Sequence, residues 1–270
     1  MNDLGLSVTP GRDIATVLNS ISGLKWAFYR QDEGTGTTLA DAGGNAPDLT
    51  INNPGNAWTN AGWLTWDTTT YCQALGNDYL DALLAPNGKK QITISFQLYV
   101  DGSGAANVAI LSYGRVTSGQ AGGYVLTIID AASTWRLSST ITDTSGTQIS
   151  GATSGESLAT GGNIYDIVFD WDVENNATQW YIDGTPAGNT KVDAPDNLPG
   201  AAATGGFVLG ARFGSSVVDS EMGTNYPTLD LRTAGLLMMS RTDKYDPTLP
   251  GRIASLRKKY SLPTFLGGYS

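Results

Sequence analysis

A two-residue alternation of apolar and polar side chains is the feature that most restricts the fold of this chain. Residues 91–100 read QITISFQLYV, and every second residue from Ile92 to Val100 is apolar. Residues 167–173 read IVFDWDV, with apolar side chains at every second position from Ile167. Successive side chains of a β-strand point to opposite faces, so this period predicts strands with one buried face.

The second of these strands continues into a predicted hairpin. Residues 174–176 form its turn, and residues 178–183 return as the partner strand. Segments rich in Gly, Asn, Ser, Thr and Pro are predicted loops, at 101–107, 114–123, 143–163, 184–206 and 214–227. The remaining strand candidates are residues 24–30, 49–52, 63–67, 108–113, 124–129, 135–141, 207–211 and 234–240.

One segment near the start of the chain has helical spacing instead. Ile14, Val17, Leu18 and Ile21 stand at positions i, i+3, i+4 and i+7, which predicts a short amphipathic helix. Gly23 ends it. The apolar face needs a surface to cover, either the domain's own flank or a neighbouring subunit or capsid protein, and we favour the second.

A second helix is predicted around residues 250–260. Pro250 is tolerated in a first turn, and Ile253 and Leu256 follow at helical spacing before Pro263 ends the helix. Residues 257–259 read RKK and fall in the last turn, where they complement the helix dipole. A solvated helix end is therefore favoured over a nucleic-acid patch.

Composition excludes several kinds of chemistry and partner. Sixteen Lys and Arg against 25 Asp and Glu give 270 residues a net charge of −9, which argues against nucleic acid or an anionic membrane surface as a partner. The chain has no histidine, which removes Ser-His-Asp and Cys-His catalysis and histidine-ligated zinc. Its single cysteine, Cys72, cannot form an internal disulfide and is expected to be buried.

The first twenty residues have neither the basic nor the apolar part of a secretory signal. No stretch approaches the ~18 apolar residues of a membrane span. We therefore expect synthesis in a cytoplasm, no export by the secretory route, and no insertion into a membrane.

Many short strands separated by glycine-rich loops predict an all-β fold, a two-sheet antiparallel jelly-roll sandwich with a short N-terminal and a short C-terminal helix. The expected organisation is an N-terminal arm at 1–22, the sandwich at 23–262 and a tail at 263–270. The aromatic side chains expected between the sheets are those of Trp26, Phe96, Phe169 and Trp171.

Four segments carry a family resemblance, in the family's order. They are residues 26–45, with a Glu-Gly-x-Gly turn; strand 92–100 followed by 110–114; strand 166–172 followed by WYIDG at 180–184; and strand 207–211. Here the chain resembles the concanavalin A-like lectin/glucanase superfamily, in particular its laminin G-like modules, over about residues 24–260. The resemblance implies a fold and not an activity, because members include lectins, adhesion modules, glycosidases and virion proteins.

Asp170, Asp172 and Glu174 are the catalytic candidates that this resemblance raises. Laminarinase-type members carry a strand of alternating carboxylates that face the cleft as nucleophile and acid/base. Positions i and i+4 of one strand face can supply the pair that a retaining glycosidase needs. Asp170 stands here in place of the first Glu, so an amphipathic strand with a solvent-facing polar side is favoured. No catalytic residue is predicted.

Oxygen-bearing side chains also flank the first glycine-rich loop. Glu33, Asp41 and Asn45 would suit Ca²⁺, which some laminin G-like modules hold there. The alternative is a turn stabilised by Asx side chains. Gly235 stands about where the family often supplies a further carboxylate, so no metal and no other cofactor is predicted.

Three tryptophans form the last candidate site. Trp58, Trp63 and Trp66 could stack on sugar rings if exposed, but packing within the domain is the favoured interpretation. The ligand-binding residues are therefore left unknown.

These observations favour a non-enzymatic virion structural protein, a capsid decoration or tail-associated protein of a phage or other virus. Its lectin-like sandwich would contact other capsid or tail proteins, further copies of itself, or a host-surface glycan, and its expected location is the virion. The alternatives are a carbohydrate-binding or adhesion module (a lectin) of a bacterial protein, and a laminarinase-type glycosidase.

Overall fold

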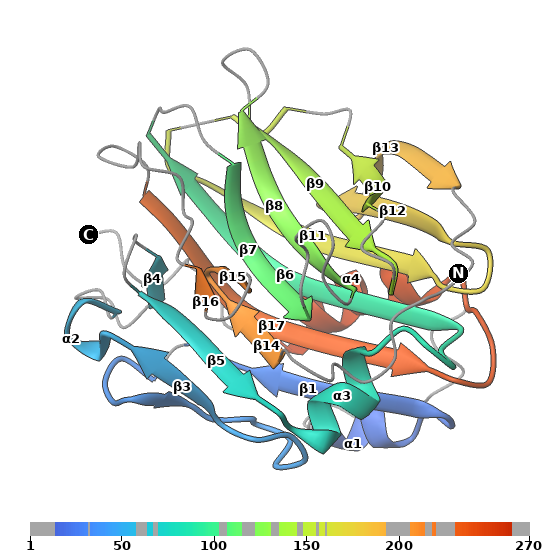
Figure 1. Cartoon of the computed structure of the whole chain (residues 1–270), viewed down its shortest axis with the longest axis horizontal. Helices are drawn as coiled ribbons and strands as arrows, with labels where there is room; N and C mark the ends of the chain where they lie inside the picture. Colours follow the sequence, from blue (N-terminus) through green and yellow to red (C-terminus); the bar gives the residue numbers. More distant parts are fainter. Residues whose placement is uncertain are drawn as a thin grey trace.

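Two antiparallel sheets pack face to face in a jelly-roll sandwich, which confirms the predicted fold class (Figure 1). The structure is a computed structural model. It describes residues 14–31, 33–57, 64–66, 70–102, 107–114, 122–130, 135–144, 148–154, 157–159, 161–192, 206–213, 218–219 and 230–260.

Sheet A has seven strands within the described residues, in the order β1-β17-β6-β11-β12-β13, with β4 also paired to β17. Strand β17, the last along the chain, lies in the interior of the sheet between β1 and β6. The strands are β1 (Leu24–Tyr29), β4 (Leu64–Trp66), β6 (Gln91–Asp101), β11 (Asn163–Asp172), β12 (Ala177–Ile182), β13 (Thr185–Val192) and β17 (Asp230–Arg241).

Sheet B has eight strands in the described part of the chain, in the order β10-β9-β8-β7-β14-β5-β3-β2. A separate two-stranded ribbon pairs β15 (Arg212–Phe213) with β16 (Val218–Asp219). The strands of sheet B are β2 (Thr38–Leu39), β3 (Leu49–Asn52), β5 (Tyr71–Leu75), β7 (Asn107–Gly114), β8 (Gly123–Asp130), β9 (Trp135–Thr142), β10 (Gln148–Thr153) and β14 (Gly206–Leu209).

Both predicted helices are present, as α1 (Ile14–Asn19) and α4 (Leu249–Tyr260). The described residues also contain a one-turn helix, α2 (Pro54–Ala57), and α3 (Asp78–Leu84), neither of which was predicted. None of the helices in the ranges given above is long and apolar enough to cross a membrane.

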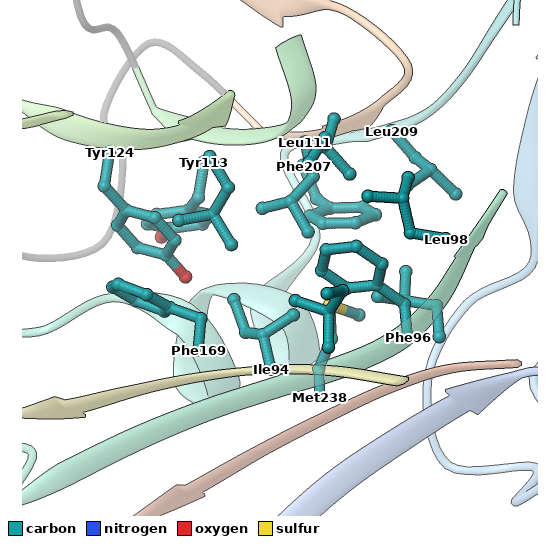
Figure 2. Close-up of a cluster of buried hydrophobic side chains, with 14 of the residues drawn as sticks. Ile94, Phe96, Leu98, Leu111, Tyr113, Tyr124, Phe169, Phe207, Leu209 and Met238 are labelled. Atoms are coloured by element: carbon teal, nitrogen blue, oxygen red, sulfur yellow. The ribbon is translucent and has the colours of Figure 1, made fainter. Parts of the chain in front are cut away.

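The main core fills the space between the two sheets. Figure 2 shows Tyr113, Tyr124 and Phe207 of sheet B facing Phe169 and other side chains of sheet A. The rings of Tyr124 and Trp171 meet edge to face, with centroids 5.7 Å apart. Phe96, Phe169, Trp171, Cys72 and Met238 all belong to this core.

A second apolar cluster lies on the outer face of sheet A, the face turned away from sheet B. It joins Val17 and Leu18 of α1 to Leu249, Ile253 and Leu256 of α4 and to side chains of β1, β11 and β17. Val17 and Leu18 are each 1% exposed. The preference for a neighbouring subunit as the surface under α1 was therefore wrong, because α1 covers its own domain. The domain boundaries themselves stay a prediction, since residues 1–13 and 261–270 lie outside the described residues.

This second cluster also corrects two other expectations. Trp26 belongs to it and not to the space between the sheets. Strand β6 was expected to bury one face, but all of its residues from Gln91 to Val100 are buried. The reason is that the 242–248 segment between β17 and α4 lies over this part of the outer face. Tyr245 covers Asp170, the carboxylate to which Thr93 donates, so polar β6 residues such as Thr93 are enclosed as well.

Candidate functional site

The candidate carboxylates project from the outer face of sheet A, where strand register places them. Asp170 pairs with Thr93 of β6 and with Gln179 of β12, and Asp172 pairs with Gln91. Asp170 is 1% exposed and Asp172 is 7% exposed. The expectation that both face solvent was therefore wrong, because sequence alternation identifies the polar side of a strand but not what covers it.

The Asp170 carboxylate is held by three neutral donors from two elements. Gln91 Nε2 and Thr93 Oγ1 donate to Oδ1 at 2.9 and 2.7 Å, and the Tyr245 hydroxyl donates to Oδ2 at 3.0 Å. Gln91 and Thr93 come from β6, whereas Tyr245 comes from the 242–248 segment. Within the described residues no cation is ion-paired with Asp170.

Gln91 connects this carboxylate to the backbone of the covering segment. Its Nε2 also donates to the carbonyl oxygen of Asp246 at 3.0 Å, and its Oε1 accepts from the Asp246 N–H at 3.0 Å. The Asp246 carboxylate in turn receives Arg252 Nη1 at 2.7 Å and lies 3.6 Å from Arg241 Nη1. The 242–248 segment is thereby fixed to β6, β11, β17 and α4.

Burial sets the protonation of this site. Removal from water raises the pKa of Asp170 to about 6, with the three donors acting in the opposite direction and the charge of Asp172 adding to the rise. Burial and the Asp170 carboxylate also raise the pKa of Tyr245 and of Tyr181. Since the chain has no histidine, which is the side chain that ordinarily titrates in this pH range, Asp170 is the candidate for a change of charge near neutral pH.

The other two carboxylates of the strand have different surroundings. Asp172 accepts from the backbone N–H of Asn175 at 3.1 Å and from its side-chain amide at 2.8 Å, which closes the turn before β12. Glu174 is exposed and pairs with Lys90 Nζ at 2.6 Å. Asp170, the first carboxylate of the motif, is therefore enclosed and hydrogen-bonded. Glu174, the last, forms an ion pair at the surface.

Asp41 is a buried acceptor for the loop that follows β2. Its Oδ1 accepts from the N–H groups of Phe28 at 2.8 Å and Gly43 at 3.3 Å. Its Oδ2 accepts from Asn45 at 2.7 Å and Ala46 at 2.9 Å. Both oxygens are therefore engaged by backbone, as in the Asx-stabilised turn that was the alternative to calcium. In the described part of the chain no group of three His, Cys, Asp or Glu side chains is placed to hold a metal ion.

Arg257 lies beside Gly235, the position where the family resemblance implies a metal-binding carboxylate. It is 3% exposed and donates through Nη1 to the Gly235 carbonyl at 2.6 Å, while its Nε lies 3.5 Å from Asp166 Oδ1. Burial lowers the pKa of Arg257 to about 10, against the influence of Asp166. The prediction of a solvated basic helix end was wrong for this residue. The side chains of Lys258 and Lys259 lie outside the described residues.

The tryptophan candidates cannot be placed together. Trp58 and Trp63 lie outside the described residues, and Trp66 ends β4, of which only the backbone is described. Cys72 is buried in the main core, as expected, and burial raises the pKa of its thiol.

Several solved structures share this architecture. The binding domain of botulinum neurotoxin serotype C1 aligns with a TM-score of 0.57 and 11% identity, over 90% of this chain and 52% of that one. A structure of type C neurotoxin, whose cell entry is described as dependent on two ganglioside molecules, aligns with a TM-score of 0.57 and 12% identity, over 93% of this chain and 54% of the neurotoxin chain. Trypanosoma rangeli sialidase aligns with a TM-score of 0.54 and 14% identity, over 90% of this chain and 34% of the enzyme.

The chain thus corresponds to about half of the toxin domains and a third of the sialidase, and the likeness is one of fold. No curated protein matches the sequence. The laminin G-like profile of the concanavalin A-like lectin/glucanase superfamily matches residues 74–224, which is more than half of the 270 residues. Together with the two-sheet jelly roll, this match shows that the chain belongs to the concanavalin A-like lectin/glucanase superfamily.

Proposed function

We propose that this chain is a non-enzymatic, lectin-like binding domain that serves as a structural protein of a virus particle. The observation that carries the non-enzymatic part is the enclosure of Asp170. The carboxylate that would act as nucleophile is 1% exposed beneath Tyr245 and is held by three hydrogen bonds. A sugar cannot reach it while the 242–248 segment is in place, and Glu174 is committed to Lys90.

Glycan contact is the binding activity that the family and its fold neighbours support best. The neighbours include the type C neurotoxin associated with gangliosides and a related binding domain in complex with SialylT. For this chain, a cell-surface glycan is therefore the proposed ligand class.

The placement on a virion rests on the sequence resemblance and on charge. A net charge of −9 suits an external position better than contact with a packaged genome, because nucleic-acid binding needs clustered cations. Capsid or tail proteins and further copies of this chain are the proposed protein partners.

Three measurements on the purified chain and its parent particle test this function. On a glycan array with sialylated and β-glucan ligands, binding to at least one glycan class is expected. With laminarin and related β-glucans, we expect no reducing ends above the background of the Asp170→Ala and Glu174→Ala variants. Turnover that disappears in both variants would instead establish the glycosidase alternative.

Localisation separates the remaining alternatives. Antibodies against the chain are expected to decorate intact particles in negative-stain electron microscopy. Glycan binding without any particle association would replace the virion role by that of a bacterial lectin or adhesion module.

A further inference from the structure

The segment that closes the outer face of sheet A is attached to the sheet by polar and apolar contacts. Residues 242–248 and α4, here called the latch, contact the sheet through hydrogen bonds, ion pairs and apolar packing. Tyr245 lies on Asp170, the Asp246 backbone on Gln91, and Asp243 and Asp246 pair with Arg241 of β17. The apolar side chains of α4 pack on the sheet, and Arg257 contacts the Gly235 carbonyl and Asp166. Most of these contacts are neutral or are satisfied at any ordinary pH. Asp170 is the exception, because a buried carboxylate has no ion-pair partner in the described part of the chain.

We propose that acid stabilises the closed latch. When the Asp170 carboxyl gains a proton, the closed form no longer encloses an unpaired charge. The hydrogen-bond partners of Asp170 can serve both the charged carboxylate and the protonated carboxyl group. The hydroxyls of Thr93 and Tyr245 can each donate to a carboxylate, and the Tyr245 oxygen can accept from the protonated carboxyl at the same 3.0 Å separation. Protonation therefore removes the cost of a buried charge without breaking the contact that holds residues 242–248. This inference does not depend on the proposed function.

The direction follows from linkage between protonation and closure. In the closed latch the pKa of Asp170 is about 6, and when the latch opens it returns towards its ordinary value of 3.8. The closed form therefore binds the proton more tightly, and acidification favours closure. For these two values the closing equilibrium constant rises about tenfold from pH 7 to pH 5.

Other groups near Asp170 do not reproduce this response in the same pH range. The pKa of Asp246 is already below its ordinary value, because hydrogen bonds from Thr248 and the charges of Arg252 and Arg241 outweigh the effect of burial. The pKa values of Tyr245 and Tyr181 are raised above 10. No histidine is present. The titratable groups that interact with Asp170 are Asp172 of β11, Tyr181 of β12 and Tyr245 of the latch. The neighbouring charges of the latch are paired with one another and with β17, Asp243 with Arg241 and Asp246 with Arg241 and Arg252.

Native-state hydrogen exchange of the full chain tests the proposal. Rates for the amides of α4 and of strand β8 are measured at pH 5 and pH 7 and divided by the intrinsic rates, which gives protection factors. Wild-type α4 is expected to gain about tenfold in protection at pH 5, while it remains less protected than β8 at both pH values. Equal protection of α4 and β8 at both pH values would show that the latch never opens on its own and would overturn the proposal.

Matched variants assign the effect to Asp170. Asp170→Asn keeps the shape of the carboxyl without its charge, so its α4 protection is expected to be as high at pH 7 as at pH 5. Glu174→Gln removes an exposed carboxylate from the turn after the same strand and is expected to keep the wild-type gain. A gain of wild-type size in Asp170→Asn, or no gain in the wild type, would refute the acid-strengthened latch.

A further variant covers the case in which Asp170→Asn does not fold. Tyr245→Phe removes one of the three hydrogen-bond donors to the Asp170 carboxylate. The closed latch with a charged Asp170 therefore loses more stability than the closed latch with a protonated Asp170. The α4 helix of this variant is expected to be less protected than wild type at pH 7 and to gain more than tenfold at pH 5. A gain equal to or smaller than that of the wild type would contradict the role of the Tyr245–Asp170 contact.

Discussion

Removal of the Asp41 carboxylate is the most direct test of how the first glycine-rich loop is held. The loop lies along the free edge of β1, where Phe28 donates to Asp41 and the Phe28 carbonyl accepts from the Ala42 N–H at 2.8 Å. An uncovered edge strand exposes unpaired backbone groups. Asp41→Ala would leave four N–H groups without their acceptor, those of Phe28, Gly43, Asn45 and Ala46.

The four hydrogen bonds do not count equally. The Phe28 N–H is buried, and a hydrogen bond to a charged group is worth about 1.5–3 kcal/mol there. The loop N–H groups of Asn45 and Ala46 are partly exposed, so water replaces much of what they lose. Asp41→Ala should therefore cost about 3 kcal/mol, which lowers Tm by roughly 6–12 °C in a domain of this size.

Thermal unfolding with and without EDTA separates this interpretation from a calcium site. The wild-type Tm is expected to be the same in EDTA as in Ca²⁺, because backbone donors already occupy both Asp41 oxygens. Asp41→Asn keeps the acceptor for Phe28 but presents an amide to the Asn45 and Ala46 donors, so about half of the loss is expected. A wild-type Tm that falls in EDTA and recovers with Ca²⁺, with no such response in Asp41→Ala, would refute the loop interpretation.

Two further predictions concern α4 and α1. Gly235 has φ of +58° and its added Cβ would lie 3.1 Å from Arg257 Nη2, whereas Gly76 has the same φ with nothing within 4 Å. Chemical denaturation should show that Gly76→Ala lowers the free energy of unfolding by about 1 kcal/mol and that Gly235→Ala lowers it clearly more. Equal losses would mean that the Arg257 side chain moves aside without cost. Leu18→Ala should cost about 2–5 kcal/mol in the monomer, against under about 0.5 kcal/mol for the exposed Thr16→Ala. A monomer indifferent to Leu18→Ala would show that α1 packs elsewhere in solution.

The sequence predicted the sandwich well because its central strands alternate strictly. Residues 49–52 form β3 with the predicted bounds, and the hairpin of β11 and β12 has its turn where expected. The sequence predicts loops where β10 and β13 form, because QISGAT and TPAGNTKV consist mostly of small, polar or turn-forming residues. These segments form strands because they lie next to β9 and β12 in the folded sheets, and not because their residues have a high intrinsic preference for strands.

Helix α3 had a readable signal that was missed. Asn77 accepts from the N–H groups of Tyr79 and Leu80, and Leu80, Leu83 and Leu84 follow at helical spacing. The cover over Asp170 had no such signal. It depends on contacts between β6, β11 and residues 242–248, which lie far apart along the chain. The alternation of apolar and polar residues within one strand gives no information about such contacts.

The position of strand β17 has a consequence for how this domain is made. Its neighbours β1 and β6 precede it by more than a hundred residues, yet they pair with it and not with each other. Such long-range pairing gives a high contact order, and folding of this kind is slow because loop closure must come before the stabilising contacts. On a translating ribosome, β1 and β6 both present open edges until β17 emerges and inserts between them. Co-translational chaperone binding is therefore expected to concentrate on these two strands during that interval.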